Sequence, residues 1–412
     1  MVTEKGSNLP IVKKRNSALI RELIYKCSPI SRAQIAGILS LTTPTITTNV
    51  AQLIEDNLVE ELRDMPATDE KALGRKPVML DFIRNARYAI GVELGPYQIS
   101  FVVTDLRGNV LYSKTDSENF SKYEQALPKY EEMLVYLSSN ISEIIPASGI
   151  PSDKFLGVGI GVPGFIEGDT GVIRNSFRKD WNGKNLARDL AKNLGISVSI
   201  ENNVRARAAG ADLFNKEMDA DTFAYYFVSH GIACPLVIRN DVLYGKTTGA
   251  GEAGHMVVEI GGPKCDTCGN NGCLEAIASE QAIRKRCAKM IKSRLSSILA
   301  QICADAEHPE MEEILKAQEC GDLSASTAIS DAINYLGVNL ANIINLISPQ
   351  SVIIDALLFA SEQNREQMLA AVKQNLFEIN NQEVQIIFEP YDPLCGAKGG
   401  AALLIKKFLL DE

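Results

Sequence analysis

Apolar residues recur at helical spacing in three stretches between positions 17 and 59. The second predicted helix opens at Ser31, and Gln34 three residues later completes a capping box. The third follows a short turn, with Thr43 as its expected N-cap and Pro44 in its first turn. Its apolar stripe must pack inward, which leaves a polar face toward solvent. The pattern predicts a small three-helix unit.

The polar face of the third helix consists of short hydrogen-bonding side chains. Thr43, Thr45, Thr48 and Asn49 lie on this face, and short side chains of this kind can approach base edges and phosphates closely. Arg32, in the preceding helix, is a further candidate for contacting DNA. Two helices joined by a tight turn with such a face are typical of a helix-turn-helix. Other three-helix bundles have the same spacing, so this alternative stays open.

A pair of extended segments follows the three helices. Residues 58–62 predict a short strand, and residues 74–80 predict a second one that carries Arg75 and Lys76 near its start. Basic side chains on an extended segment can enter the minor groove of DNA. We interpret residues 10–82 as a winged helix-turn-helix of the α+β class, with a plain linker at residues 74–80 as the alternative.

From residue 86 onward, strands and helices alternate. Strands are expected at residues 88–92, 99–104, 110–113 and 155–162, and helical periodicity spans residues 130–144. This order predicts α/β lobes.

The chain has a net charge of −9, but basic residues outnumber acidic ones near the N-terminus. Seven basic residues and one acidic residue lie between Lys5 and Leu53. Basic charge gathered at one end of an otherwise acidic chain suits contacts with phosphates. Double-stranded DNA therefore remains a possible partner despite the overall sign.

Length and composition describe a large globular protein. A chain of 412 residues with 46% hydrophobic and 23% charged residues suits two or three domains with sizeable cores. We expect no secretory signal and no membrane span, because the most apolar stretch, 336–360, is interrupted by polar residues and a proline. Nine scattered cysteines do not suggest a disulfide framework, and we expect a cytoplasmic location.

The densest group of candidate metal ligands lies between His255 and Cys273. Cys265 and Cys268 are separated by two residues, a spacing that lets one turn supply two zinc ligands. Cys273 follows five residues later, and His255 precedes Cys265 by ten. These four residues predict a structural zinc site.

The residues around this group resemble the signature of the ROK family (repressors, open reading frames and sugar kinases). The similar segments are Gly251-Glu252-Ala253-Gly254-His255 and Gly272-Cys273-Leu274-Glu275, although the family usually has one residue between the first two cysteines, where this chain has two. The resemblance implies that zinc holds the loop of His255. It also implies a sugar site, whose residues are Gly164, Asn202, Asn203, Glu252, His255 and Glu275.

The same resemblance implies an actin-like, ribonuclease H-like fold with the two lobes of a sugar kinase. The expected domains are residues 1–85 for DNA binding, 86–200 with 395–412 for the first lobe, and 201–394 for the second lobe with the zinc loop.

Three positions that kinases of this family use for the nucleotide differ in this chain. Pro96 and Tyr97 stand where the first phosphate loop has glycine and threonine, and proline has no N–H to donate. The second loop, 229–235, keeps only Gly231 where the kinases have a Gly-Thr-Gly-rich turn, and Asp355 replaces a glycine on the adenosine side. Asn203 replaces the aspartate that acts as the general base, and an amide cannot accept a proton at neutral pH. We therefore expect no catalytic residue and no enzyme.

These patterns together predict a sugar-responsive transcriptional regulator, a repressor that a monosaccharide or its derivative releases from operator DNA. A homodimer or tetramer is expected, with a structural zinc ion in each chain and no membrane contact. Two alternatives remain: an ATP-dependent sugar kinase that retains a DNA-binding domain, and a sugar-binding protein whose N-terminal helices contact other proteins.

Overall fold

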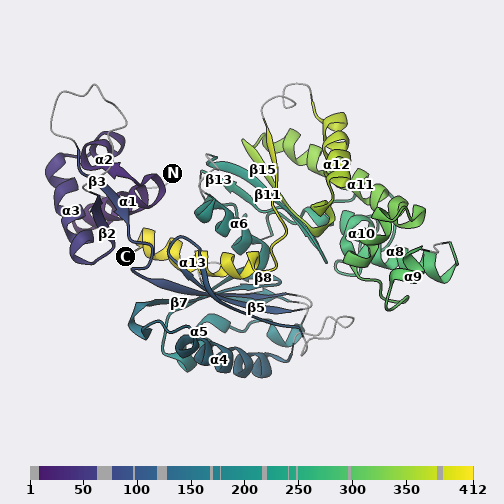
Figure 1. Ribbon diagram of the computed structural model, residues 1–412, viewed down its shortest axis with the longest axis horizontal. Helices are drawn as coiled ribbons and strands as arrows, with labels where there is room; N and C mark the ends of the chain where they lie inside the picture. The colour runs from purple at the N-terminus through teal and green to yellow at the C-terminus, as the bar shows by residue number, and fades with distance from the viewer. Residues whose placement is uncertain are drawn as a thin grey trace.

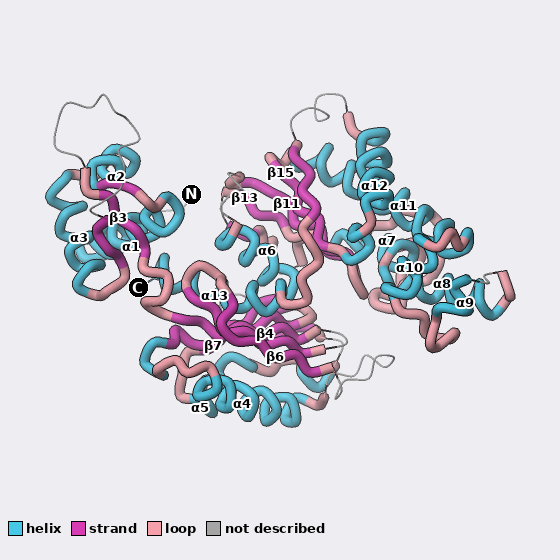
Figure 2. The backbone as a smooth tube through the Cα atoms, viewed as in Figure 1, coloured by secondary structure: helices cyan, strands magenta, loops and turns pink. Residues whose placement is uncertain are grey.

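The computed structural model describes residues 9–62, 77–95, 98–117, 128–167, 170–176, 178–215, 220–239, 241–246, 249–295, 298–377 and 384–411. The described chain forms an N-terminal head and two α/β lobes, each lobe built on its own sheet (Figures 1 and 2). Among the described helices, none is long and apolar enough to cross a lipid bilayer.

The head contains three helices and a three-stranded antiparallel sheet in the order β1-β3-β2. Its elements are α1 (Leu9–Cys27), β1 (Ile30–Ser31), α2 (Arg32–Leu39), α3 (Thr43–Glu55), β2 (Val59–Leu62) and β3 (Met79–Phe82). The predicted capping box is confirmed, because Ser31 Oγ accepts from the Gln34 backbone N–H at 3.3 Å and Gln34 Oε1 accepts from the Ser31 N–H at 2.9 Å. The N-cap predicted for the third helix is wrong. Thr42 occupies that position and Thr43 is the first helical residue, since the helix begins one residue earlier than Pro44 suggested.

The second strand predicted for the wing, at residues 74–80, begins later in the structure than expected. It spans Met79–Phe82 and pairs with both β2 and β1. Arg75 and Lys76 lie outside the described residues. The two-residue strand β1 was not predicted, because it is too short to produce an alternating pattern.

The first lobe is a five-stranded sheet in the order β10-β7-β4-β5-β6. Its strands are β4 (Tyr88–Leu94), β5 (Ile99–Asp105), β6 (Val110–Asp116), β7 (Phe155–Val162) and β10 (Val198–Asn202). The four predicted strands are confirmed, three of them longer than expected and β7 with the predicted bounds. Helices α4 (Tyr130–Ala147) and α5 (Leu186–Leu194) cover one face, and the other is covered by α13 (Cys395–Asp411) (Figure 1).

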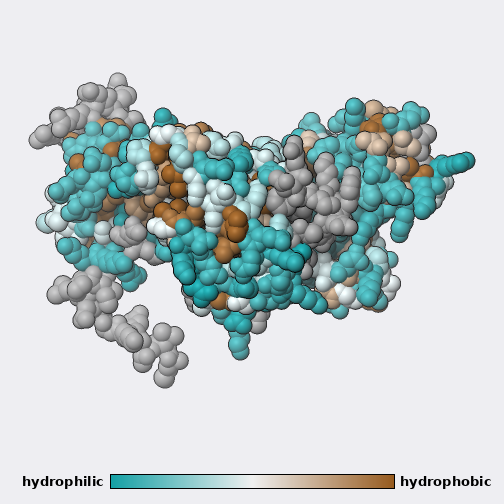
Figure 3. All heavy atoms as spheres, turned by 90° about the horizontal axis from the view of Figure 1, so that it is seen from below, coloured by the Kyte–Doolittle hydropathy of each residue, from teal (hydrophilic) through white to brown (hydrophobic). Residues whose placement is uncertain are grey.

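Small elements connect the larger parts of the first lobe. They are η1 (Ser152–Lys154), the hairpin β8 (Phe165–Glu167) and β9 (Val172–Asn175), and η2 (Lys179–Trp181). Seen from below, the face of the molecule is largely hydrophilic, with a limited number of apolar side chains exposed (Figure 3).

The second lobe has a sheet in the order β14-β13-β11-β15-β16, with β12 paired to β11. Its strands are β11 (Thr222–Val228), β12 (Ile232–Ala233), β13 (Leu236–Ile238), β14 (Asp241–Val242), β15 (Ser351–Asp355) and β16 (Gln385–Phe388). Its helical elements are η3 (Ala253–His255), α7 (Leu274–Ala278), α8 (Glu280–Lys292), α9 (Ile298–Ile302), α10 (Met311–Glu319), α11 (Leu323–Ile347), η4 (Leu357–Ala360) and α12 (Glu362–Asn375).

Two helices join the three parts. Helix α6 (Asn203–Phe214) packs against α13 on one side, and its Val204 and Ala208 belong to a hydrophobic cluster with the second sheet on the other. Helix α13 runs from the region between the lobes to the head (Figure 1), where its last turns share one hydrophobic core with α1. Arg21 of α1 donates from Nε to the Leu409 carbonyl at 2.8 Å. The head is therefore packed onto the first lobe through the C-terminal helix.

Candidate functional site

A cavity of about 690 Å³ lies between the two lobes. Its walls come from residues at or just after the carboxyl ends of β7, β10, β11 and β15, and from η3 and α7. Clefts at the carboxyl ends of parallel strands are common ligand sites in α/β proteins. All six residues of the predicted sugar site line this cavity: Gly164, Asn202, Asn203, Glu252, His255 and Glu275.

The first-lobe side of this site is organised by Asn202, the N-cap of α6. Its Oδ1 accepts from the backbone N–H groups of Val204 and Arg205, at 3.0 and 3.2 Å, and its Nδ2 donates to the Gly164 carbonyl at 2.9 Å. Gly164 has φ +121°, and a Cβ there would lie 2.3 Å from the Asn175 carbonyl oxygen, so only glycine fits. Asn202 thus fixes both the turn at Gly164 and the position of Asn203 at the start of α6.

The second-lobe side presents two carboxylates. Glu275 Oε1 accepts from the Thr267 hydroxyl at 2.6 Å, and Glu275 Oε2 accepts from the Ile232 N–H at 3.3 Å. Glu252 lies just before η3, and burial raises the pKa of its carboxyl group. Thr267 is one of the two residues between Cys265 and Cys268, where the family usually has one. Its hydrogen bond to Glu275 helps to hold a wall of the cavity.

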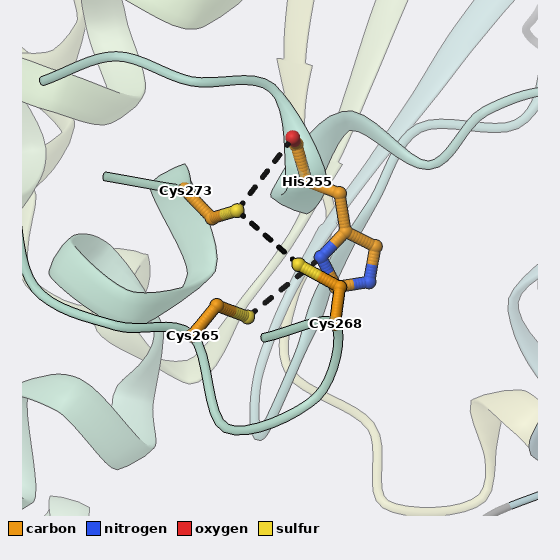
Figure 4. A group of neighbouring side chains, drawn as sticks. All are labelled: His255, Cys265, Cys268 and Cys273. Carbon is orange, nitrogen blue, oxygen red and sulfur yellow. Dashed lines mark hydrogen bonds between the residues drawn. The ribbon is translucent and has the colours of Figure 1, made fainter. Parts of the chain in front are cut away.

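The four predicted metal ligands form one cluster. The ligand atoms of His255, Cys265, Cys268 and Cys273 all lie within 4.8 Å of one another (Figure 4). Cys268 Sγ is 3.5 Å from Cys273 Sγ, and Cys265 Sγ is 3.9 Å from His255 Nδ1. Zn–S and Zn–N bonds of the usual lengths place tetrahedral ligand atoms about 3.5–3.8 Å apart. The cluster can therefore hold a metal ion, and its donor atoms suit zinc.

A buried ion network connects the two lobes beside the cavity. Arg207 of α6 binds Glu93 of β4 in a bidentate manner, with both N···O distances 2.8 Å, and binds Asp355 of β15 at 2.8 Å. The Tyr225 hydroxyl donates to the same Asp355 oxygen at 2.7 Å. Burial lowers the pKa of Arg207, but the two carboxylates outweigh it and raise the pKa above its usual value. The guanidinium group therefore stays charged.

Asp355, which stands where the resemblance implies a glycine, belongs to this network together with Glu93. Glu93 and Asp355 come from strands in different sheets, and each side chain is less than a tenth exposed. A Cβ added at Gly396 would lie 1.9 Å from the Glu93 carboxyl carbon, so α13 can pass this site only with glycine there. Sequence analysis did not identify Arg207. The available signal was a pair of arginines within an otherwise alanine-rich helix, since a buried charge needs partners.

A second ion pair lies near the loop that leads to Glu252. Arg205 Nη1 is 3.6 Å from Glu201 Oε1, and the Tyr244 hydroxyl donates to Glu201 Oε2 at 2.9 Å. Arg205 also donates to the Ala250 carbonyl at 3.3 Å. These contacts attach the segment before Glu252 to the start of α6.

Four of the candidate DNA-contacting residues, Thr43, Thr45, Thr48 and Asn49, lie on α3, and Arg32 begins α2. Thr43 and Thr48 are exposed and Thr45 and Asn49 are half-buried, whereas Ile46, Val50 and Leu53 are buried. The structure thus gives α3 one buried apolar face and one polar face. Arg32 is ion-paired with Glu61 of β2, at 2.8 Å.

Trp181 belongs to the hydrophobic core and not to the cavity wall. Its ring is fully buried, and Nε1 donates to the Pro128 carbonyl at 3.1 Å. Its size makes burial favourable, and the Tyr130 ring packs against it edge-on.

Comparisons with known proteins agree with this architecture. Over 400 residues the chain is 28% identical to the xylose repressor of Bacillus subtilis (strain 168), a match that covers 97% of each chain. Its fold is similar to the crystal structure of a ROK family transcriptional regulator, a homologue of the E. coli MLC protein, with a TM-score of 0.80, 25% identity and 97% coverage of each chain.

A sugar kinase shares the two-lobed part of the fold. The ROK family glucokinase of Streptomyces griseus, in complex with glucose and AMPPNP, gives a TM-score of 0.64 and 21% identity over 77% of this chain and 98% of that one. The predicted actin-like, kinase-type fold is therefore confirmed for the lobes. A model described as the ROK family matches residues 89–407, which is most of the chain, and the protein belongs to the ROK family.

Proposed function

We propose that this protein is a sugar-responsive transcriptional repressor. The observation that carries the proposal is the combination, in one chain, of a cavity in which Asn203 stands in place of the family's catalytic aspartate and a head that shares a hydrophobic core with the first lobe. The similarity to proteins named as repressors and transcriptional regulators, over nearly the whole chain, supports the same function. A productive kinase needs a carboxylate where Asn203 stands, so sugar phosphorylation is not favoured.

The head acts as a winged helix-turn-helix that binds operator DNA. Helix α3 enters the major groove with its polar face, and the segment between β2 and β3 contacts the adjacent minor groove. The residues proposed to contact DNA are Arg32, Thr43, Thr45, Thr48, Asn49, Arg75 and Lys76. The assignment is supported by Thr48, which is exposed, and by Asn49, which is half-buried, since neither belongs to the buried face formed by Ile46, Val50 and Leu53.

The cavity binds the sugar through the six residues given above. Amide and carboxylate groups suit sugar hydroxyls, because an amide both donates and accepts and a carboxylate accepts. A structural zinc ion bound by His255, Cys265, Cys268 and Cys273 fixes the loop that carries Thr267. That loop in turn holds Glu275 in place, through the hydrogen bond between Thr267 and Glu275.

The working units are residues 1–85, 86–200 with 395–412, and 201–394. A symmetric homodimer presents two heads to two half-sites, since dimeric helix-turn-helix proteins read half-sites about one helical turn apart. The sugar releases DNA by binding one lobe arrangement better than the other. Helices α6 and α13 are suited to transmit this change, because they link the cavity to the head.

The test is fluorescence anisotropy of a labelled fragment of the DNA upstream of the gene. We expect tight, salt-dependent binding that one sugar of a monosaccharide panel weakens. Replacing Thr48 or Asn49 by Ala should lower DNA affinity about tenfold. The matched control is Thr327→Ala on α11, whose hydroxyl, like that of Thr48, donates to the carbonyl four residues before it.

The sugar arm of the test uses Asn203→Ala. This variant should still bind DNA as tightly as the wild type but should no longer respond to the sugar. If no sugar changed the affinity for DNA under any salt condition, the proposed function would be wrong, and release of ADP with hexoses and ATP would become the next measurement.

A further inference from the structure

The wall of the cavity carries far more negative than positive charge. Its described lining contains eight carboxylates and two arginines. Two of the carboxylates, Glu252 and Glu275, belong to the proposed sugar site. Five others are named here the acidic group: Glu280, Glu310, Glu312, Glu313 and Asp355. The eighth is Glu93.

Both arginines of the lining already bind carboxylates of the same cavity. Arg207 binds Glu93 and Asp355, as described above. Arg284 Nη2 is 3.0 Å from Glu310 Oε2, and its Nε donates to the Pro309 carbonyl at 2.7 Å. Burial lowers the pKa of the His230 imidazole, so this ring also adds no charge at neutral pH. An incoming anion would have to displace a carboxylate from either arginine.

Polar groups of the turn after β11 are also hydrogen-bonded to carboxylates of the chain. Ser229 Oγ donates to Glu280 Oε2 at 3.0 Å, and the Glu280 N–H donates to the Ser229 carbonyl at 2.9 Å. Three residues further on, the Ile232 N–H donates to Glu275. One hydroxyl and one N–H group of this turn thus bind carboxylates of the chain.

Two of the helix N-termini at the cavity, those of α8 and α10, carry acidic residues in their first turns, whereas the N-terminus of α6 is capped by the neutral Asn202 side chain. A helix N-terminus attracts anions through its free N–H groups and its dipole. In α10, Glu310 and Glu313 form a capping box, with the Glu310 N–H donating to Glu313 Oε2 at 2.9 Å, and Glu312 adds charge to the first turn. In α8, the Ser279 side chain caps the Ala282 N–H and Glu280 occupies the first turn. In both of these helices, acidic residues of the chain already occupy the first turn, where a phosphate would bind.

We infer that the effector is an uncharged, unphosphorylated sugar, and that the acidic group excludes phosphorylated sugars from the cavity. This inference rests on the proposed function and specifies the ligand class of the same site. Sugar hydroxyls donate hydrogen bonds to carboxylates, whereas a phosphate meets like charges whose counter-charges are already used. The acidic group is thus the specificity-determining part of the cavity.

The test compares a free sugar with its own phosphate, using the full chain and isothermal titration calorimetry. The pairs are glucose and glucose 6-phosphate, xylose and xylose 5-phosphate, and N-acetylglucosamine and its 6-phosphate. For the sugar that binds, we expect the phosphorylated form to bind at least about tenfold more weakly. Glu280→Gln and Glu312→Gln together should reduce this ratio severalfold without changing affinity for the free sugar.

Two controls keep the outcomes distinct. Glu366→Gln, an exposed carboxylate of α12 outside the cavity, should leave the ratio unchanged. Equal or tighter binding of the phosphorylated form, or a ratio that the double variant does not move, overturns the inference while the proposed function stands. Binding of neither form to the folded protein contradicts the sugar-sensing function itself, and the inference with it.

Discussion

The metal cluster and the Arg207 network both hold walls of one cavity, but they are assembled in different ways. The four cluster residues come from a segment of 19 residues, 255–273, and their spacing along the chain is visible in the sequence. The three charged residues of the network lie 114 and 148 positions apart, on β4, α6 and β15. Only the meeting of two sheets brings them together.

Because of this difference, the two centres should respond differently when one of their residues is replaced. A metal loop is local, so losing a ligand should loosen the loop and spare the lobes. A buried ion network spans the molecule, and removing one member leaves the others charged and without solvent. The following predictions test this contrast.

The largest effect is expected for the metal cluster itself. Cys268→Ser should abolish stoichiometric zinc binding, because a structural site depends on all four ligands and the metal contributes about 10 kcal/mol or more of binding free energy in small zinc domains. Zinc content measured by plasma mass spectrometry checks this. Limited proteolysis should then cut near residues 262–272 first. Cys320→Ser, an exposed cysteine outside the cluster, is the control, and full zinc in Cys268→Ser would refute the site.

Arg207→Met should lower the free energy of unfolding of the chain by about 3–5 kcal/mol, because Glu93 and Asp355 remain buried without a counter-charge. Urea unfolding followed by circular dichroism measures this loss. The control is Arg188→Met, whose ion pair with Asp189 is exposed and should be worth no more than about 1 kcal/mol. Equal losses in the two variants would show that the network is not a structural link.

Glu280, one member of the acidic group, should make stability depend on pH. Burial raises the pKa of Glu280 from 4.5 to about 7. Between these values the folded protein binds more protons than the unfolded chain, so this residue lowers stability as the pH rises from 4.5 to 7. Glu280→Gln should flatten that part of the profile in thermal unfolding measured at closely spaced pH values. A wild-type contribution that instead rose with pH would contradict the assignment.

The smallest effect is expected at the hydrogen bond between Thr267 of the metal loop and Glu275. Thr267→Val removes the hydroxyl that binds Glu275 and should cost about 1 kcal/mol or less, since the bond is exposed. We expect zinc content to be unchanged and sugar affinity to fall severalfold, as measured by calorimetry. A loss of zinc in this variant would mean that Thr267 acts on the metal and not on Glu275.

Much of the architecture could be predicted from local patterns. The bounds of β7, the capping box of α2 and the metal cluster each depend on residues less than 20 positions apart. The misplaced cap of α3 is an error of one residue, because both Thr42 and Thr43 fit the preference for that position.

The sequence by itself determined the helices of the head, the alternating elements of the lobes and the ligands of the metal cluster, because hydrophobic period, caps and ligand spacing act over short distances. Only the tertiary structure decided that Glu93 and Asp355 share Arg207, and that carboxylates pair with both arginines of the cavity and stand in the first turns of α8 and α10. It also decided that α13 joins the cavity to the head. The physical reason is that burial makes each charge depend on partners supplied by distant strands and helices.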